Sequence, residues 1–228
     1  YRCICVSPGN RGAAAVGAKN RAFATDYRVF FGPDNPELAE FAAVERVYTK
    51  NDSFLFTVAP RDGRVFTRET LAAIEELTEG AWQIPYSIRV DSITNFQHSS
   101  ADGDDLIVED LIQNAGALDS VALDDARAIA MSRPELYRRL ISESGAATGV
   151  VVIVQLPEED PKELFEAVGA ARALVERMEA DHPNIDVHLT GMSMLNNAFV
   201  ESGMRDLTTL IPIMYLVFIV AMIVVLRS

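Results

Sequence analysis

The sequence predicts an α+β fold: a domain with a four-stranded sheet and a helical insertion, followed by one transmembrane helix. The predicted elements run strand–helix–strand, insertion, strand–helix–strand, which is the order of a ferredoxin-like split βαβ domain. The first and third strands are apolar on both faces, as central strands are, whereas the second and fourth alternate as edge strands do. The apolar run from Leu207 to Leu226 is long enough to cross a bilayer.

The first part of the chain contains two predicted helices and two predicted strands. Asp34 and Glu37 form a capping box with proline inside the first turn, which predicts a short amphipathic helix. A strand follows at Ser53–Ala59 and ends at a proline and an Arg-Asp-Gly turn. Thr67 begins a second amphipathic helix, and the alternation in Ser87–Phe96 predicts a half-exposed strand.

The middle of the chain, Gln97–Gly149, is predicted to be a long insertion, polar at first and then helical. Ser132 and Glu135 form another capping box, which predicts that a helix begins there. Gly145 is a candidate residue for the end of that helix. The apolar segment Val150–Leu156 is the third predicted strand.

The last part of the domain repeats the strand–helix–strand pattern and continues into the membrane. Asp160 and Glu163 cap a long helix that ends at a His-Pro-Asn sequence, and Ile185–Thr190 alternates as an edge strand. No strong helix breaker lies between Ser193 and Pro212, so one helix is predicted to run from the domain into the bilayer. About 34 helical residues span about 50 Å, so the first half of this helix stands above the membrane.

Composition limits the partners. The net charge of −13 argues against nucleic acid and anionic lipid surfaces, which both require clustered Lys and Arg, and an ordinary solvated acidic surface explains it. Cys3 and Cys5 are too close in sequence to form a typical disulfide and match no metal-ligand spacing. Residues 1–25, rich in Ala, Gly and Arg, are interpreted as a disordered or non-native lead-in, with a basic membrane-surface arm as the alternative.

Motifs for metal binding, phosphate binding and catalysis fail at the positions that the chemistry requires. The acidic segment Asp102–Asp105 starts like an EF-hand, but positions five and twelve are Leu106 and Gln113. The segment Gly12–Lys19 resembles a phosphate loop except that an alanine separates the second glycine from the lysine. The three histidines are scattered, and no nucleophile–base pair is evident. No metal, cofactor or catalytic residue is therefore expected.

Two sets of residues are candidates for a role in moving a hydrophobic molecule. The first set, Phe54, Phe56 and Phe96, would line a hydrophobic substrate path, although membership of the core is the favoured interpretation. On the last helix, Glu201 and a basic residue four positions later are predicted to form a solvated ion pair. The candidate coupling residues of this helix are Gly203, Arg205, Asp206 and Pro212. The apolar run contains no Asp, Glu, Lys or Arg, so it cannot carry a proton relay.

Four short segments form a combination that is more specific than any one of them. They are Asp26–Glu37, Lys50–Asp52, Arg89–Phe96 and Leu189–Gly191. Together they resemble the resistance-nodulation-division (RND) superfamily, and in particular its MMPL-type predicted exporters. The resemblance covers about residue 26 to the C-terminus. It implies that residues 26–192 form an extracytoplasmic porter-like domain, and that residues 193–228 form the supramembrane and transmembrane parts of helix two.

The resemblance also implies a function. Such exporters use the proton gradient to move lipids or other hydrophobic compounds across the bacterial inner membrane, with the porter domain on the periplasmic side. The implied partners are the lipid bilayer, the remaining transmembrane helices of the transporter and a hydrophobic or lipid substrate. Helix one, the second half of the transporter and the proton-relay residues have no counterpart here, and residues 1–25 do not match. The chain is therefore expected to be part of a longer protein and not to transport alone.

Other functional classes stay open at this point. A membrane-anchored sensor or interaction module would use the same α/β domain to bind a small ligand or a protein. A tail-anchored cytoplasmic protein would end directly after the apolar helix. An enzyme is the least favoured class because the catalytic motifs fail. Orientation in the membrane rests on Arg227 and the resemblance alone.

Overall fold

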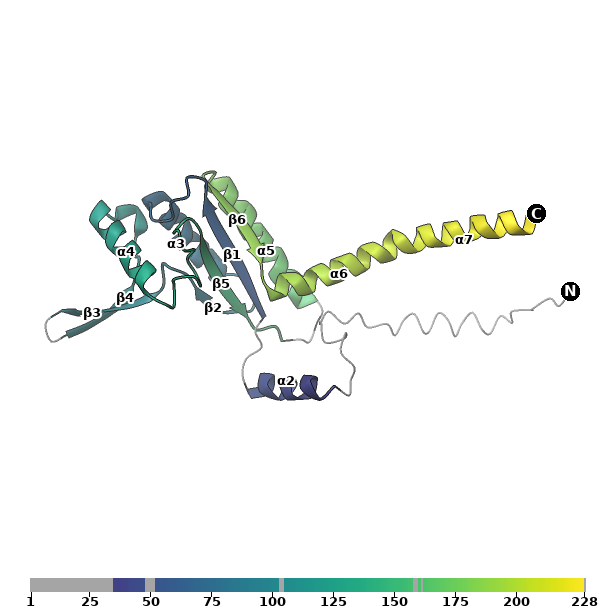
Figure 1. Cartoon of the computed structure of the whole chain (residues 1–228), viewed down its shortest axis with the longest axis horizontal. Coiled ribbons are helices and arrows are strands. Elements are labelled where there is room, and N and C mark those ends of the chain that lie inside the picture. Colours follow the sequence, from purple (N-terminus) through teal and green to yellow (C-terminus); the bar gives the residue numbers. More distant parts are fainter. Residues whose placement is uncertain (1–34, 48–51, 103–104, 158–159, 161, 228) are drawn as a thin grey trace.

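The computed structural model describes residues 35–47, 52–102, 105–157, 160 and 162–227. The predicted lead-in at residues 1–25 and the predicted cap at Asp34 lie outside these residues. The described chain forms a compact α/β head, a helix set apart from the sheet, α2 (Pro36–Val47), and a long C-terminal helix that extends away from the head (Figure 1). The Asn35 side chain caps α2 by accepting a 2.9 Å hydrogen bond from the Glu37 amide.

A four-stranded antiparallel sheet forms the centre of the head. Its strands lie in the order β2 (Ser87–Asp91), β5 (Thr148–Val154), β1 (Asp52–Pro60) and β6 (Ile185–Thr190). The first and third strands of the domain are therefore central, and the second and fourth are the edges. This order confirms the predicted ferredoxin-like fold.

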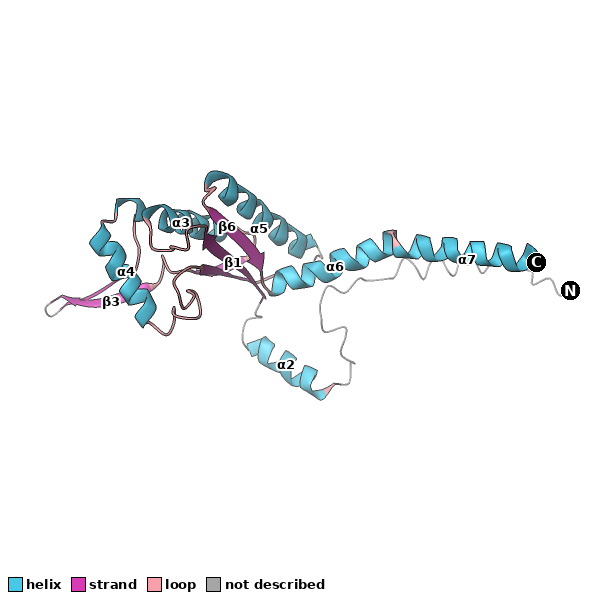
Figure 2. Cartoon of the chain, turned by 45° about the horizontal axis from the view of Figure 1, so that its top comes forward, coloured by secondary structure: helices cyan, strands magenta, loops and turns pink. Residues whose placement is uncertain are grey.

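Two helices cover one face of this sheet, α3 (Arg68–Trp82) and α5 (Lys162–Asp181) (Figure 2). Both begin where the sequence predicts. The Thr67 hydroxyl accepts from the Thr70 amide at 3.2 Å. The box before α5 is reciprocal, because Asp160 accepts from the Lys162 amide at 2.9 Å while Glu163 accepts from the Asp160 amide at 3.0 Å.

The core lies between these helices and the sheet. The largest fully buried side chains of this layer share the inward face of β1 and β5 and the apolar stripes of α3 and α5: Phe54, Phe56, Val58, Leu71, Ile74, Leu77, Val150, Val152 and Met178.

The opposite face of the sheet has no covering helix, and here the structure corrects an expectation. The central strands are apolar on both faces, but burial in β1 alternates, with Leu55 and Thr57 only half-buried. Val151 and Ile153 of β5 are half-buried in the same way, and Val151 lies opposite Leu55. Both crossover helices of a split βαβ unit pack on the same side, so the fold itself leaves this open face partly exposed.

The second strand ends earlier than predicted. It stops at Asp91, not Phe96, because Asn95 organises the chain into a loop. The Asn95 side chain accepts from the Ser92 amide at 2.8 Å and donates to the Val90 carbonyl at 2.7 Å. Local hydrogen bonds of this kind compete with a strand ladder. A separate hairpin then follows, β3 (Gln97–Asp102) and β4 (Asp105–Asp110), where the sequence predicts only a polar segment.

The helical part of the insertion is α4 (Ser120–Ser132), capped by Asp119. The prediction that a helix begins at Ser132 is wrong, because α4 ends there and the Ser132 hydroxyl donates back to the Ile129 carbonyl. The proline that follows Arg133 pushes that residue out of the helical region, to φ −88° and ψ 122°. Gly145 is a turn residue with φ +70° and not a helix end.

The C-terminal helix runs as α6 (Met192–Thr208) and α7 (Leu210–Arg227), so the prediction of an unbroken helix is wrong at Thr209. Pro212 lacks an amide hydrogen, and its ring crowds the carbonyl one turn before it. The hydroxyls of Thr208 and Thr209 also donate to carbonyls three to four residues back, which favours bending. Helical bonding nevertheless crosses the irregularity, since Thr209 donates to the Arg205 carbonyl at 2.9 Å.

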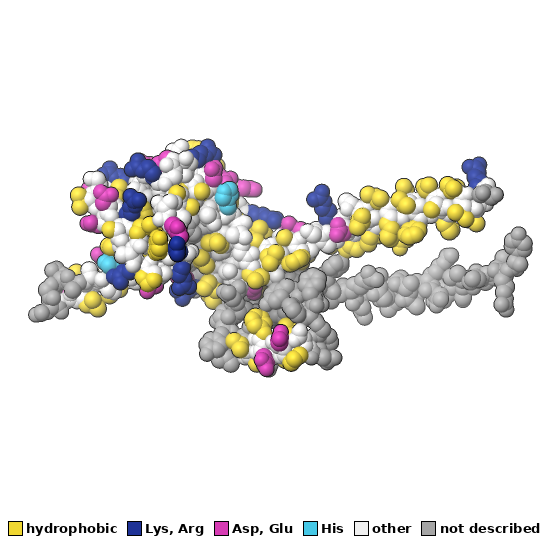
Figure 3. All heavy atoms as spheres, in the orientation of Figure 1, with side chains coloured by type: hydrophobic (Ala, Val, Ile, Leu, Met, Phe, Trp, Pro, Cys, Tyr) yellow, Lys and Arg dark blue, Asp and Glu magenta, His cyan; other side chains and the backbone are white. Residues whose placement is uncertain are grey.

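Among the described residues, Met192–Arg227 is the one helix that is long and apolar enough to cross a membrane. None of its most apolar window is buried against the head. Figure 3 shows hydrophobic side chains along α7. A soluble core helix would be covered on at least one side, so lipid is the environment that fits this surface.

Candidate functional site

The joint between the head and the C-terminal helix begins at Gly191, which separates β6 from α6. Gly191 has φ +121° and ψ 172°, a region that is accessible essentially to glycine alone. A Cβ at this position would collide with the carbonyl oxygen of Ser53 and lie 2.9 Å from the Phe54 Cα. The chain therefore passes directly against β1 as it enters α6, and this contact sets where the long helix starts.

The first turns of α6 are buried in the head through polar side chains. Ser193 and Asn197 are fully buried, and α6 packs against β1, β6 and α5. Within the described part of the chain, the Ser193 Oγ and the Asn197 Oδ1 have no hydrogen-bond partner. Buried polar atoms of this kind are costly, which makes this seam less stable than an apolar one.

A clamp holds the third turn of α6 to α5. The Arg172 guanidinium of α5 donates to both Glu201 carboxylate oxygens, at 2.7 and 3.1 Å, and the Asn197 amide donates to the same carboxylate at 2.7 Å. The prediction that Glu201 pairs with Arg205 is wrong, because Glu201 faces α5 instead. The hydrogen bonds from Arg172 and then Asn197 lower the pKa of Glu201 below its ordinary value, while partial burial opposes the shift.

Replacing Glu201 with glutamine should destabilise the head slightly at neutral pH. Each partner of the pair is about half exposed, with side chains 47% accessible, so we expect a loss of about 0.5–1 kcal/mol and a fall in Tm of about 1–4 °C. Because the folded-state pKa of Glu201 is lowered, its stabilisation is present above the unfolded pKa. It disappears as the pH falls through the lower folded pKa.

Thermal unfolding of both proteins in detergent between pH 7 and pH 3 checks this expectation. Asp206→Asn is the matched control, since Asp206 is an exposed acid on the same helix and makes no side-chain ion pair with the described residues. A Tm difference for Glu201→Gln that stays constant down to pH 3 would argue against the clamp.

The four candidate coupling residues all lie beyond this clamp. Gly203 is helical, and a Cβ there would meet no atom within 4 Å. Arg205 and Asp206 are exposed, and the Arg205 carbonyl accepts the bonds that carry the helix across Thr209. Pro212 lies in the first turn of α7 and accounts for the irregularity. These residues share the helix between head and membrane but form no cluster.

A pocket of about 610 Å³ lies on the open face of the sheet. One wall comes from the end of β2, the Ser92–Gln97 loop and Val151 of β5. The other wall is a turn of the insertion that contains Leu136 and Leu140. We call this the sheet-face pocket. Four charged residues from the two walls line it: Arg89, Asp91, Glu135 and Arg139.

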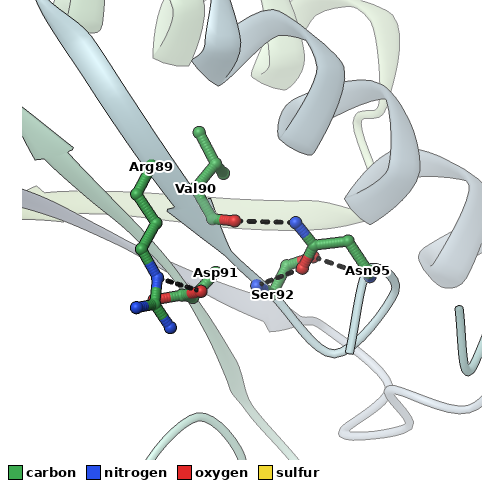
Figure 4. Close-up of polar contacts among 5 residues, drawn as sticks. All are labelled: Arg89, Val90, Asp91, Ser92 and Asn95. Carbon is green, nitrogen blue, oxygen red and sulfur yellow. Dashed lines mark hydrogen bonds and ion pairs between the residues drawn. The ribbon is translucent and has the colours of Figure 1, made fainter. Parts of the chain in front are cut away.

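Hydrogen bonds fix the sheet side of the pocket (Figure 4). The Arg89 Nε donates to the Asp91 carboxylate at 2.9 Å. Next to this pair, Ser92 is buried and its hydroxyl lies 2.7 Å from the Thr94 hydroxyl, while Asn95 ties the loop back to β2. The charged rim therefore sits on a rigid loop.

The structure separates the three candidate substrate-path aromatics. Phe54 and Phe56 are fully buried beneath α3 and α5, on the face opposite the pocket. Phe96 alone lines the sheet-face pocket. Sequence reasoning missed the other pocket residues, because Glu135 and Arg139 are about 45 positions from β2 and carry no motif of their own.

The pattern of this chain matches a known family. The family model described as the MMPL family matches residues 64–228, a range that includes the joint, the clamp and the sheet-face pocket. The chain belongs to the MMPL family. No curated protein matches it.

Membership in the MMPL family makes this a protein of a membrane transporter family, not of an enzyme family. The segments that carry the RND resemblance lie at the two features above. Arg89–Phe96 forms the pocket wall and Leu189–Gly191 leads into the joint. In the described part of this MMPL chain no group of three or more His, Cys, Asp or Glu side chains is placed to hold a metal ion. His182 instead pairs with Glu76 at 2.9 Å.

Proposed function

We propose that this MMPL chain forms the porter-like domain and the second transmembrane helix of an RND-type exporter. The exporter uses the proton gradient to move lipids or other hydrophobic compounds out of the bacterial inner membrane. The head lies on the periplasmic side and forms part of the substrate path. The observation that carries the proposal is the family match over a head joined to a lipid-compatible helix.

The role of this chain in transport is mechanical. Its apolar helix contains no Asp, Glu, Lys or Arg between Leu207 and Leu226, so protons are relayed by other transmembrane helices. Movement of those helices reaches the head through α7 and α6. The Gly191 contact and the Arg172–Glu201 clamp prevent the first turns of α6 from swinging freely on the sheet. Rocking of the bundle therefore moves the head as one body.

Deleting the gene from its bacterium tests the function for any substrate, because every lipid and hydrophobic class is measured together. We expect at least one such class to accumulate in the inner membrane and to decrease outside it, as measured by mass spectrometry. Supplying the full-length gene should restore transfer, and a protonophore should stop the restored transfer in a pulse-labelling experiment.

An unchanged distribution of every lipid and hydrophobic class after deletion would contradict the exporter. Transfer that continues after collapse of the proton gradient would contradict the energy source alone. Ligand binding by the head without any transfer would instead favour a membrane-anchored ligand-binding module.

A further inference from the structure

We propose that the sheet-face pocket binds the headgroup and upper chain of a single-chain zwitterionic amphiphile. This inference rests on the proposed function in one respect, since it names a substrate class for the exporter. The binding itself depends only on the pocket. The two walls supply an apolar floor and separate charges of both signs, and a molecule with both kinds of group complements them.

The floor of the pocket is apolar. Phe96, Leu140 and Val151 line it, and Leu136 beneath them is fully buried. The pocket volume of about 610 Å³ falls within the range of about 300–1,000 Å³ that is typical of small-molecule sites. Apolar surface of this kind is stabilised by a hydrocarbon chain because contact removes both surfaces from water.

The charges at the rim are of two kinds. Arg89 and Asp91 already neutralise each other through their ion pair. Glu135 and Arg139, on the insertion wall, make no ion pair with any residue that the structure describes. One acid and one base of the same wall are thus available to a ligand.

This arrangement favours a zwitterion over a singly charged ligand. An anion that approaches Arg139 also meets the carboxylate of Glu135, and a cation that approaches Glu135 also meets Arg139. The unfavourable contact offsets much of the favourable one. A phosphate or carboxylate with a nearby ammonium group pairs with both residues at once.

The insertion wall is built to hold these two side chains in place. Glu135 and Arg139 flank a tight turn in which the Leu140 amide donates to the Leu136 carbonyl at 2.9 Å. Arg138 has φ +62°, a left-handed conformation that is unfavourable for a residue other than glycine, and its amide donates to the Ile141 carbonyl at 2.9 Å. A strained turn next to an open pocket is consistent with a binding role.

Photo-crosslinking of the full chain in lipid nanodiscs tests the proposal. Three probes share a twelve-carbon chain with a diazirine and differ in headgroup: phosphocholine, sulfate and trimethylammonium. Mass spectrometry then locates the adducts. We expect phosphocholine-probe adducts on the peptides that contain Phe96, Leu140 and Val151, at about threefold or greater yield than with either singly charged probe.

Single substitutions at the rim separate the two charge contacts. Arg139→Gln should lower the yield of phosphocholine adducts in the pocket by about twofold to fivefold. Glu135→Gln should lower it to a similar extent while raising the yield with the sulfate probe. Arg138→Gln is the matched control, because Arg138 is adjacent, pairs with Glu143 and does not line the pocket.

The result that would overturn the proposal is equal labelling by the three probes, or labelling confined to α7. A full yield of pocket adducts with Arg139→Gln would overturn it as well. None of these outcomes bears on lipid transfer after gene deletion, so failure of the pocket and failure of the exporter are distinguishable.

Discussion

Replacing Gly191 with alanine should lower the free energy of unfolding of the head by about 3 kcal/mol or more. Two costs combine at this position. The backbone has φ +121°, which a residue with a Cβ adopts only under strain. The added Cβ would also overlap the Ser53 carbonyl and approach the Phe54 Cα to 2.9 Å, and both atoms belong to the backbone of a central strand.

Thermal unfolding of the full chain in detergent, followed by circular dichroism, measures this effect. A loss of about 3 kcal/mol corresponds to a fall in Tm of about 6–12 °C for a domain of this size. Gly203→Ala is the matched control and should leave Tm unchanged or raise it slightly, because alanine is favoured in a helix and meets no neighbour there. Equal Tm values for the two variants would show that the contact at Gly191 does not hold the joint.

The sheet could be predicted from the sequence because its signals are local. Alternation or continuous apolar runs identify the four strands, and the reciprocal box at Asp160 and Glu163 marks the start of α5. The inference that both faces of β1 are covered failed for a different reason. An apolar side chain such as Leu55 shows preference for burial, but the topology decides which face receives the helices.

The hairpin and the end of α4 could not be predicted from the patterns used. Ser132 and Glu135 satisfy the capping-box pattern, yet the preceding residues already form a helix and Ser132 ends it. The short strands β3 and β4 are polar or flanked by acids, so their alternation is weak. Asn95 decides where β2 ends through hydrogen bonds to its own loop, and these depend on the folded geometry.

The candidate site was only partly predictable for the same reason. The sequence indicates the C-terminal helix, but helical spacing alone pairs Glu201 with Arg205. In the structure Glu201 pairs with Arg172, which is 29 residues away on another helix. The sheet-face pocket likewise joins β2 to a turn of the insertion. Contacts between distant segments leave no periodic signal in one sequence.

The central claim of the account is that the helix from Gly191 to Arg227 transmits movement between membrane and head. Breaking this helix between the clamp and the bilayer should therefore stop export while leaving the head folded. The double variant Ser202→Gly, Gly203→Pro keeps the chain length but introduces a proline within α6. Proline in a helix interior removes one hydrogen bond, clashes with the preceding turn and costs about 3 kcal/mol.

The head should survive this change because the buried contacts of Ser193 and Asn197 and the Arg172–Glu201 clamp all lie before the break. Gly203→Ala is the matched control, since it alters the same position and preserves the helix. Protease resistance of the head and the amount of protein in the membrane must be equal for the two variants before export is compared.

The most direct measurement is the export rate of the compound identified by gene deletion, in cells that contain equal membrane amounts of each full-length variant. We predict that export with Gly203→Ala equals that of the unmodified protein, and that Ser202→Gly, Gly203→Pro lowers it about tenfold or more, which corresponds to only about 1.4 kcal/mol in the coupled step. An export rate for the double variant within a factor of two of the control, with its helix broken and its head intact, would contradict the account.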